Sequence, residues 1–148
     1  MKIKQIILIF LSALIIGCSG FSSSEDINKS LIKEMLDDIK ISFNLIDLGN
    51  IMYHYHEDFF HQGNLYEDEL IRWESRLINY DEMNITDVEV ELNSGFAVVY
   101  FTLIFNNEEG SDQWSEPSEE NGDISYLIFS DNRWQIYGNQ LAEDQLPQ

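Results

Sequence analysis

The residues that most clearly indicate the fold are 85–105, ITDVEVELNSGFAVVYFTLIF. In residues 85–92, apolar side chains alternate with acids and other polar residues, which is typical of a strand with one face in water. Residues 96–105 are apolar on both faces, as expected of a strand inside a sheet. Asn93-Ser94-Gly95 joins the two runs and has the composition of a tight turn. The stretch therefore predicts an antiparallel hairpin whose second strand lies at the centre of a sheet.

Three helices are expected before this hairpin. Apolar residues recur at helical spacing over residues 27–46, which indicates an amphipathic helix of about five turns. A short second helix is expected to follow and to carry Ile51, Met52 and Tyr55. Residues 66–80 show a third helical pattern. The apolar face expected for this third helix consists of Leu70, Ile71, Trp73, Leu77 and Ile78.

The remaining residues are expected to complete the sheet. Residues 106–123 contain Gly, Pro and seven acids without a base, which predicts a long loop in water. Its acids are Glu108, Glu109, Asp112, Glu116, Glu119, Glu120 and Asp123. Residues 124–130 and 133–138 are expected to pair as strands around a turn. The order predicts an α+β fold, with three N-terminal helices packed on one face of a curved antiparallel sheet.

Two interpretations of the acidic loop stay open. Its carboxylates would bind calcium loosely, although the alternating Asp-x-Asp-x-Asp-Gly pattern of an EF-hand is absent. The favoured interpretation is a solvated loop whose charge keeps a sheet edge from pairing with other molecules. Trp114 stands out in so polar a segment, and we expect it to fold over a pocket mouth or to meet a partner.

Composition excludes several classes of function. The 148 residues include 27 acidic and 8 basic ones, so the formal net charge is −19 and nucleic acid or anionic lipid would be repelled. With 44% hydrophobic residues the chain has enough apolar side chains for a core. A single cysteine excludes disulfide frameworks and multi-cysteine metal motifs. Since no phosphate loop, dinucleotide fingerprint or nucleophile elbow occurs, we expect no cofactor.

The N-terminus has the pattern of an export signal. Lys2 and Lys4 precede an apolar run at residues 6–16, which is too short to span a bilayer. The following Ile15-Ile16-Gly17-Cys18 resembles the bacterial lipobox, which implies that residues 1–17 are a signal peptide and that Cys18 is lipidated. The alternative is an ordinary signal peptide with an incidental cysteine. Cys18 to Ser24, small and polar apart from Phe21, is expected to be the lipidated cysteine and a flexible tether.

Lipidation at Cys18 predicts a cell-envelope protein that is held on a membrane without a transmembrane helix. Ser19, in place of Asp, resembles the signal for the outer membrane in a double-membraned bacterium. In a single-membraned host the anchor would be the outer face of the cytoplasmic membrane. Removal of residues 1–17 takes away two lysines and no acid, so the mature chain has 6 basic and 27 acidic residues and a net charge of −21.

Three segments together resemble the nuclear transport factor 2-like family, also called SnoaL-like or cystatin-like cone proteins. They are residues 47–52 with Tyr55 and Asp58-Phe59, the hairpin at 88–105, and residues 126–129 with the closing turn and strand at 131–136. The resemblance implies a domain over residues 25–140, followed by a tail at 141–148, in which a sheet wraps a pocket. The family contains isomerases, dehydratases, epoxide hydrolases, subunit partners and ligand binders, so the fold does not give the function. Members often dimerise through the sheet face, which makes a homodimer a further expectation.

The densest group of polar and aromatic residues is 53–61, YHYHEDFFH, which contains all three histidines. His54, His56 and His61, with a neighbouring acid, would supply ligands for zinc or copper. On a helix, however, residues two apart point about 200° from each other, so His54 and His56 would not share a face. We therefore expect no metal, and solvated histidines at a helix end are the favoured interpretation.

An alternative function is proton-transfer catalysis of the ketosteroid isomerase or dehydratase type. It requires an acid or a histidine in an apolar pocket, with a tyrosine donor nearby. Asp58, His61, Tyr100 and Tyr126 are the residues of the required types. Nothing in the sequence places them at a diagnostic spacing, so no catalytic residue is assigned.

The sequence therefore predicts a lipid-anchored, non-catalytic binding domain for a small apolar ligand or an envelope protein. Its expected pocket-lining residues come from helices and strands alike: Phe43, Met52, Tyr55, Phe59, Trp73, Tyr100, Phe101, Tyr126 and Trp134. Ordinary core packing is the alternative role for each of them.

Overall fold

The structure of the chain, a computed structural model, describes residues 23–118 and 122–142. The expected signal peptide, Cys18 and most of the expected tail lie outside these described residues, as do Glu119 and Glu120 of the acidic segment. Within the described ranges no helix is both long enough and apolar enough to cross a membrane.

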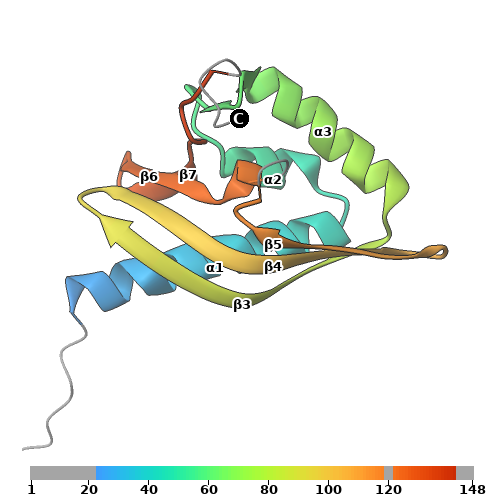
Figure 1. The fold of residues 1–148 in the computed structure, drawn as a ribbon, viewed down its shortest axis with the longest axis horizontal. Helices are drawn as coiled ribbons and strands as arrows, with labels where there is room; N and C mark the ends of the chain where they lie inside the picture. The colour runs from blue at the N-terminus through green and yellow to red at the C-terminus, as the bar shows by residue number, and fades with distance from the viewer. Residues whose placement is uncertain (1–22, 119–121, 143–148) are drawn as a thin grey trace, which may run out of the picture.

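The three expected helices are present (Figure 1). They are α1 (Ser24–Asn44), α2 (Leu48–Tyr53) and α3 (Tyr66–Asn79). A capping box starts α1, because the Ser23 side chain accepts from the Asp26 amide and the Asp26 carboxylate accepts from the Ser23 amide. Tyr55, expected in the second helix, instead follows its end and forms a parallel bridge with Ile136.

The strands form one curved antiparallel sheet and one small hairpin. The large sheet contains β3 (Glu82–Asn93), β4 (Phe96–Asn107), β5 (Gly110–Glu116), β6 (Tyr126–Ser130) and β7 (Arg133–Ile136), and the hairpin contains β1 (Phe60–His61) and β2 (Asn64–Leu65). Along one edge β4 pairs with β3, and along the other it pairs first with β6 and then with β5. The expected hairpin with a central second strand is thus confirmed. A register shift between Thr86 and Glu89 accompanies the bend of β3.

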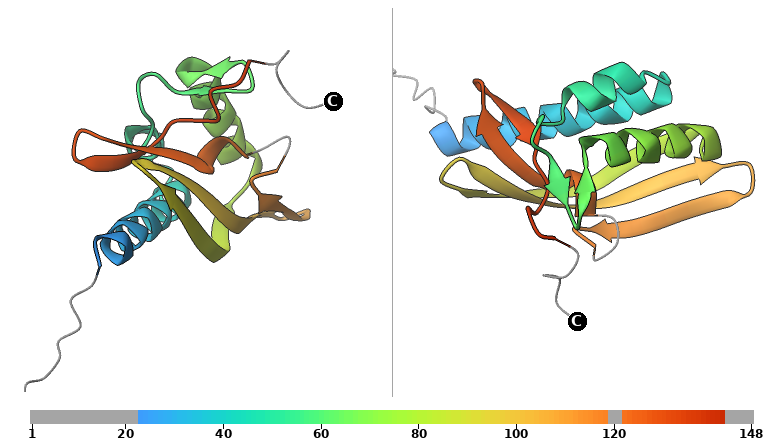
Figure 2. Two further views of the ribbon diagram at one scale, coloured as in Figure 1. Left: turned by 60° about the vertical axis from the view of Figure 1, so that its left-hand side comes forward. Right: turned by 90° about the horizontal axis from the view of Figure 1, so that it is seen from above.

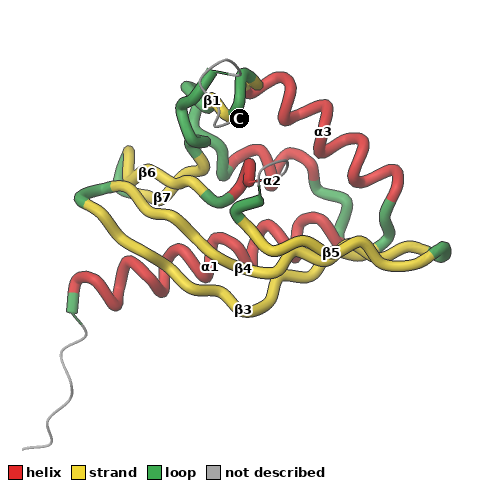
Figure 3. The backbone as a smooth tube through the Cα atoms, in the orientation of Figure 1, coloured by secondary structure: helices red, strands yellow, loops and turns green. Residues whose placement is uncertain are grey.

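The acidic segment was expected to be a loop, and this prediction is wrong for most of it. Figure 3 shows β5 as a strand, and its residues pair with β4 from Phe101↔Glu116 to Asn107↔Gly110. Polar side chains suit this strand because backbone hydrogen bonds hold it at an edge, where most of its residues are exposed. Trp114 packs edge-on against Phe105, at 5.6 Å between ring centroids, and so joins the core.

The helices lie on one side of the curved sheet (Figure 2), and together they enclose one hydrophobic core. α1 contributes Ile32, Leu36, Ile39 and Phe43 to this core, which is the stripe expected of a helix that covers a sheet. The fold is therefore the expected α+β arrangement. On α3, however, Ile71 and Ile78 are exposed, whereas Glu69 and Arg76 are buried.

The chain after β7 closes the domain against β1. Phe60 donates its amide to the Tyr137 carbonyl at 3.1 Å, and Gln140 donates to the Phe60 carbonyl at 2.9 Å. Gly138 lies between these contacts with φ +79°, and a Cβ there would overlap the Phe60 carbonyl oxygen. Only glycine fits this position without movement of the backbone.

Candidate functional site

A half-open groove lies between α1, the end of α2 and the β6–β7 hairpin. Its volume is about 300 Å³, and we call it the α1 groove. It is lined by Leu31, Glu34, Met35, Asp38, Tyr53, His54, Asn132, Arg133 and Trp134. A shallower hollow of about 230 Å³ continues from it along α1, past Ser30, Ile27 and Asp26.

The apolar wall of the α1 groove is a second stripe on α1, separate from the stripe that covers the sheet. Ile27, Leu31 and Met35 follow one another at four-residue spacing and so lie along one side of the helix. Ile27 is 51% exposed and Leu31 is 44% exposed. Trp134 forms the facing wall, and its indole Nε1 donates to Asn28 Oδ1 of α1 at 3.0 Å. Helix and hairpin are thus joined at the groove.

A histidine–carboxylate pair forms the polar part of the α1 groove. His54 Nε2 lies 2.8 Å from Asp38 Oδ2, and Asn50 Nδ2 donates to the same oxygen at 3.0 Å. These hydrogen bonds lower the pKa of Asp38. Burial lowers the pKa of His54, with a smaller contribution from Arg133, while Asp38 opposes the shift. His54 is therefore neutral at pH 7, with Nε2–H toward Asp38, an assignment made from the hydrogen-bond network.

Arg133 closes the end of the α1 groove nearest α2. Its guanidinium stacks over the Tyr53 ring at 4.0 Å, and its Nη1 donates to the Tyr53 carbonyl at 2.9 Å. On the other side of this contact lies a second surface groove of about 380 Å³, which Met52, Tyr55 and Gln135 help to line. Arg133 therefore separates two neighbouring depressions.

Charged residues are buried inside the cone, which the sequence did not indicate. We call Glu69, Arg72, Arg76 and Asp123 the interior ionic cluster. Arg76 donates to both carboxylate oxygens of Asp123, at 2.8 and 3.3 Å, and its guanidinium lies 4.6 Å from the centre of the Trp73 ring. Glu69 and Asp123 are both fully buried. Arg72 Nη1 lies 3.0 Å from Glu69 Oε1, but neither atom makes a well-oriented hydrogen bond.

The interior ionic cluster holds its two acids in different protonation states. Burial raises the pKa of Glu69 to about 8, and the negative charge of Asp123 adds to this shift. Burial also acts to raise the pKa of Asp123, but the Arg76 guanidinium outweighs it and leaves that pKa below its usual value. At pH 7 the cluster therefore contains a protonated Glu69 beside an ionised Asp123.

Other buried polar atoms near the centre of the molecule also lack partners. Outside the Glu69–Arg72 pair, three buried side-chain atoms of the described residues make no hydrogen bond to a protein group: His61 Nε2, Ser125 Oγ and Gln135 Oε1. The enclosed part of the cone is polar as well as aromatic.

The expected pocket-lining residues divide between the core and the surface. Seven of them belong to the hydrophobic core: Phe43, Met52, Tyr55, Phe59, Trp73, Phe101 and Trp134. Of these, Trp134 lines the α1 groove, and Met52 and Tyr55 line the second groove. Tyr100 is 42% exposed and donates to Glu91 at 3.3 Å, away from the core. Tyr126 is half-buried.

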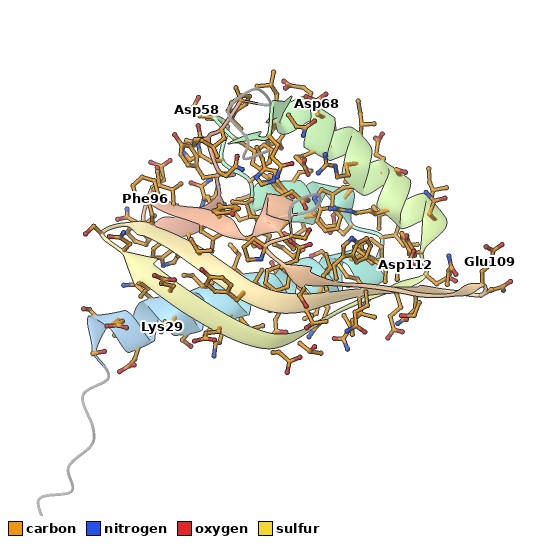
Figure 4. All side chains as sticks on the ribbon, in the orientation of Figure 1. Lys29, Asp58, Asp68, Phe96, Glu109 and Asp112 are labelled. Carbon is orange, nitrogen blue, oxygen red and sulfur yellow. The ribbon has the colours of Figure 1, made fainter. Side chains whose placement is uncertain are left out.

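The residues considered for proton transfer come together only in part. His61 is buried, and its ring lies 5.7 Å from that of Tyr126. Asp58 lies at the outer edge of the molecule (Figure 4), with its side chain 78% exposed. Tyr100 is also exposed, so neither it nor Asp58 joins His61.

The three histidines have three separate environments. His54 pairs with Asp38, His56 accepts from the Asp58 amide through Nδ1, and His61 accepts from the Asn139 amide through Nδ1. His54 and His61 are buried, so the interpretation of solvated helix-end histidines does not hold for them. In the described part of the chain, no group of three or more His, Cys, Asp or Glu residues could hold a metal ion.

Comparisons with known proteins identify the fold. No protein-family model matches the chain, and no curated protein matches its sequence. A protein of unknown function with a cystatin-like fold from Nostoc punctiforme is 15% identical, with a TM-score of 0.58, over 81% of this chain and 92% of that one. A nuclear transport factor 2-like protein of unknown function from Shewanella oneidensis is 16% identical, with a TM-score of 0.59, over 74% and 93%.

A proposed scytalone dehydratase from Novosphingobium aromaticivorans is also similar in structure. It is 11% identical, with a TM-score of 0.55, over 76% of this chain and 80% of that one. At these identities the similarity shows the fold alone. The chain thus has the nuclear transport factor 2-like cone fold that its sequence resembles.

Proposed function

We propose that this chain is a lipid-anchored protein of the bacterial cell envelope whose cone domain binds a small, largely apolar ligand in the α1 groove without turning it over. The α1 groove is the observation that carries this proposal. Its volume of about 300 Å³ is at the lower end of the range for small-molecule sites. Apolar walls with a few fixed polar groups are typical of such sites, and Leu31, Met35 and Trp134 supply the walls.

The anchor follows from the lipobox-like sequence at Cys18. Only residues 19–23 separate this cysteine from α1, so the Cα atoms of Cys18 and Ser24 can be at most roughly 20 Å apart. Since the mature chain would carry a net charge of −21, electrostatic adhesion to anionic lipid would not hold it at a membrane. Labelling with an alkyne fatty acid should modify the wild type and leave C18S unlabelled and released from membranes. Membrane retention of unlabelled C18S would refute lipid anchoring.

Native mass spectrometry tests the ligand. The chain should be released from its own host's envelope without denaturation, and a bound small molecule should appear as an added mass. Leu31→Ser places a hydroxyl in the groove wall and should abolish this mass. Ile78→Ser is the matched control, since Ile78 is a strongly exposed apolar residue of α3 outside the groove. A bare wild-type mass would shift the proposal to a protein partner, and cross-linking in the envelope would then follow.

A second candidate function is proton-transfer catalysis in the cone. The observation that favours it is the interior ionic cluster, where a buried Glu69 with a pKa of about 8 lies near ionised Asp123. Buried His61 and half-buried Tyr126, whose rings lie 5.7 Å apart, contribute further polar groups. Incubation with a panel of cyclic ketones in D₂O tests this function, because proton abstraction would incorporate deuterium. Incorporation by the wild type and none by Glu69→Gln would establish catalysis.

A further inference from the structure

We infer that the ligand of the α1 groove carries a positive charge, so that it is a cationic amphiphile with an apolar body and a protonated amine. This inference rests on the proposed function and specifies its ligand class. It is argued from the distribution of charge around α1, from the partners of the groove carboxylates and from the position of Arg133.

Carboxylates run beside the apolar stripe of α1 at the same spacing. Ile27, Leu31 and Met35 form the apolar stripe, and the neighbouring line at residues 26, 30, 34 and 38 reads Asp, Ser, Glu and Asp. Each line advances by about four residues, so its members are roughly 6 Å apart along the helix. A ligand whose apolar part contacts Leu31 and Met35 would therefore meet the carboxylates of Glu34 and Asp38 on one side.

The groove carboxylates have no cation of their own in the described residues. Glu34 accepts one hydrogen bond, from the Ser30 hydroxyl at 3.2 Å, and takes part in no ion pair. Asp38 is bound by Asn50 and by His54, whose lowered pKa leaves it neutral at pH 7. The negative charge of Glu34 and Asp38 is therefore available to a ligand.

The lysines of α1 lie on the opposite face of the helix. At about 100° per residue, Lys29, Lys33 and Lys40 point roughly 160° to 180° away from Leu31. Two of them are already paired, Lys29 with Glu25 at 2.7 Å and Lys40 with Asp37 at 2.6 Å. The helix thus separates its cations from the groove, and its groove side is acidic.

Among the described residues that line the groove, Arg133 is the one permanent cation, and Tyr53 of α2 holds it. Its stacking on Tyr53 and its hydrogen bond to the Tyr53 carbonyl orient the guanidinium toward α2. An anionic ligand beside Arg133 would share the groove with Glu34 and Asp38 and would be repelled by both. A cationic ligand meets its counter-charges along α1, with its apolar part against Trp134.

Three probes of equal chain length test the charge of the ligand. Octylammonium, octanol and nonanoate each carry an eight-carbon alkyl chain and differ only in their headgroups, and each would be titrated calorimetrically at pH 7 and low salt. The full chain would be held in nanodiscs of zwitterionic phosphatidylcholine, with empty nanodiscs as the blank. Because an exposed ion pair contributes only a few-fold in affinity, octylammonium should bind roughly two- to fivefold more tightly than octanol, with nonanoate weakest.

The variants assign this preference to the groove. Glu34→Gln keeps the shape of the side chain and should reduce the preference for octylammonium over octanol, and its combination with Asp38→Asn should bring the two affinities close together. Glu67→Gln, at an exposed glutamate on α3, is the matched control and should leave the preference unchanged. Raising the salt concentration should weaken octylammonium binding and leave octanol binding unaffected.

The outcomes separate the inference from the proposed function. Equal binding of the three probes, or tightest binding of nonanoate, would overturn the cationic ligand and leave an apolar site in place. Failure of all three probes to bind would overturn both the apolar site in the α1 groove and the charge assigned to its ligand. A preference for octylammonium that survives the combined removal of both groove carboxylates, in Glu34→Gln with Asp38→Asn, would also overturn the inference, because the charge would then be recognised outside the groove.

Discussion

Replacing Glu69 with glutamine should make the free energy of unfolding depend less on pH. Burial and Asp123 raise the pKa of Glu69 from 4.5 to about 8, a difference of about 3.5 units. The folded chain keeps this proton to higher pH than the unfolded chain does. The stabilising effect of protonation is therefore complete below pH 4.5 and is lost as the pH rises through 8.

The magnitude follows from about 1.36 kcal/mol for each pKa unit. The whole pKa difference changes the free energy of unfolding by at most about 5 kcal/mol. About 3 to 4 kcal/mol of this change should occur between pH 5 and pH 8. Glu69→Gln has a similar shape and does not titrate. The free energy of unfolding of the variant, relative to wild type, should therefore rise by this amount over that interval.

Urea unfolding followed by tryptophan fluorescence measures this difference at each pH. Titrating groups that do not interact with Glu69 are common to both proteins and cancel in the comparison. Asp123 does interact with Glu69, but its lowered pKa keeps it ionised throughout pH 5 to pH 8. Glu67→Gln, on the exposed side of the same helix, should stay within about 0.5 kcal/mol of wild type throughout. If the difference between Glu69→Gln and wild type did not change from pH 5 to pH 8, a buried, protonated Glu69 would be refuted.

Two further substitutions test other parts of the cone. Arg76→Met leaves Asp123 buried without its cation, so it should lower the free energy of unfolding by about 3 to 5 kcal/mol in urea titrations. The double variant that also carries Asp123→Asn has no buried unpaired charge and should recover most of this loss. A loss below 1 kcal/mol would contradict a dry ion pair. Gly138→Ala would place a side chain at a positive φ and against the Phe60 carbonyl. Gly95→Ala is the control, because φ is +91° there but the space is open, and it should lower the free energy of unfolding by about 1 to 2 kcal/mol. The loss for Gly138→Ala should be clearly larger. Equal losses in thermal or urea unfolding would show that no clash occurs at Gly138.

Most of the fold could be predicted because its patterns are local. Residues 85–105 carry both strand periodicities and the turn between them, and α1 repeats its apolar residues over five turns. By contrast, β5 owes its structure to backbone pairing with β4, which imposes little on side chains at an edge. An acidic edge strand and an acidic loop therefore look alike in sequence.

The candidate site was predictable only in part, because the residues that contact each other in it are far apart in the sequence. Arg76 and Asp123 are 47 residues apart, and nothing near either residue indicates the other. The available signal was on α3, where Glu69 and Arg76 flank Trp73 at helical spacing and so occupy core-facing positions. Likewise, the apolar residues of α1 belong to two stripes, and separating them requires knowing where the sheet lies.

The β4–β5 hairpin reaches beyond the rest of the domain, and Figure 4 shows Glu109 at its tip. Its turn at residues 108–109 touches neither the α1 groove nor the interior ionic cluster, and the strands beneath it pair with each other up to Asn107↔Gly110. Added residues would extend the turn and leave the enclosed core as it is. This tip is accordingly where an epitope or a fluorescent reporter can be inserted to follow the protein in living cells.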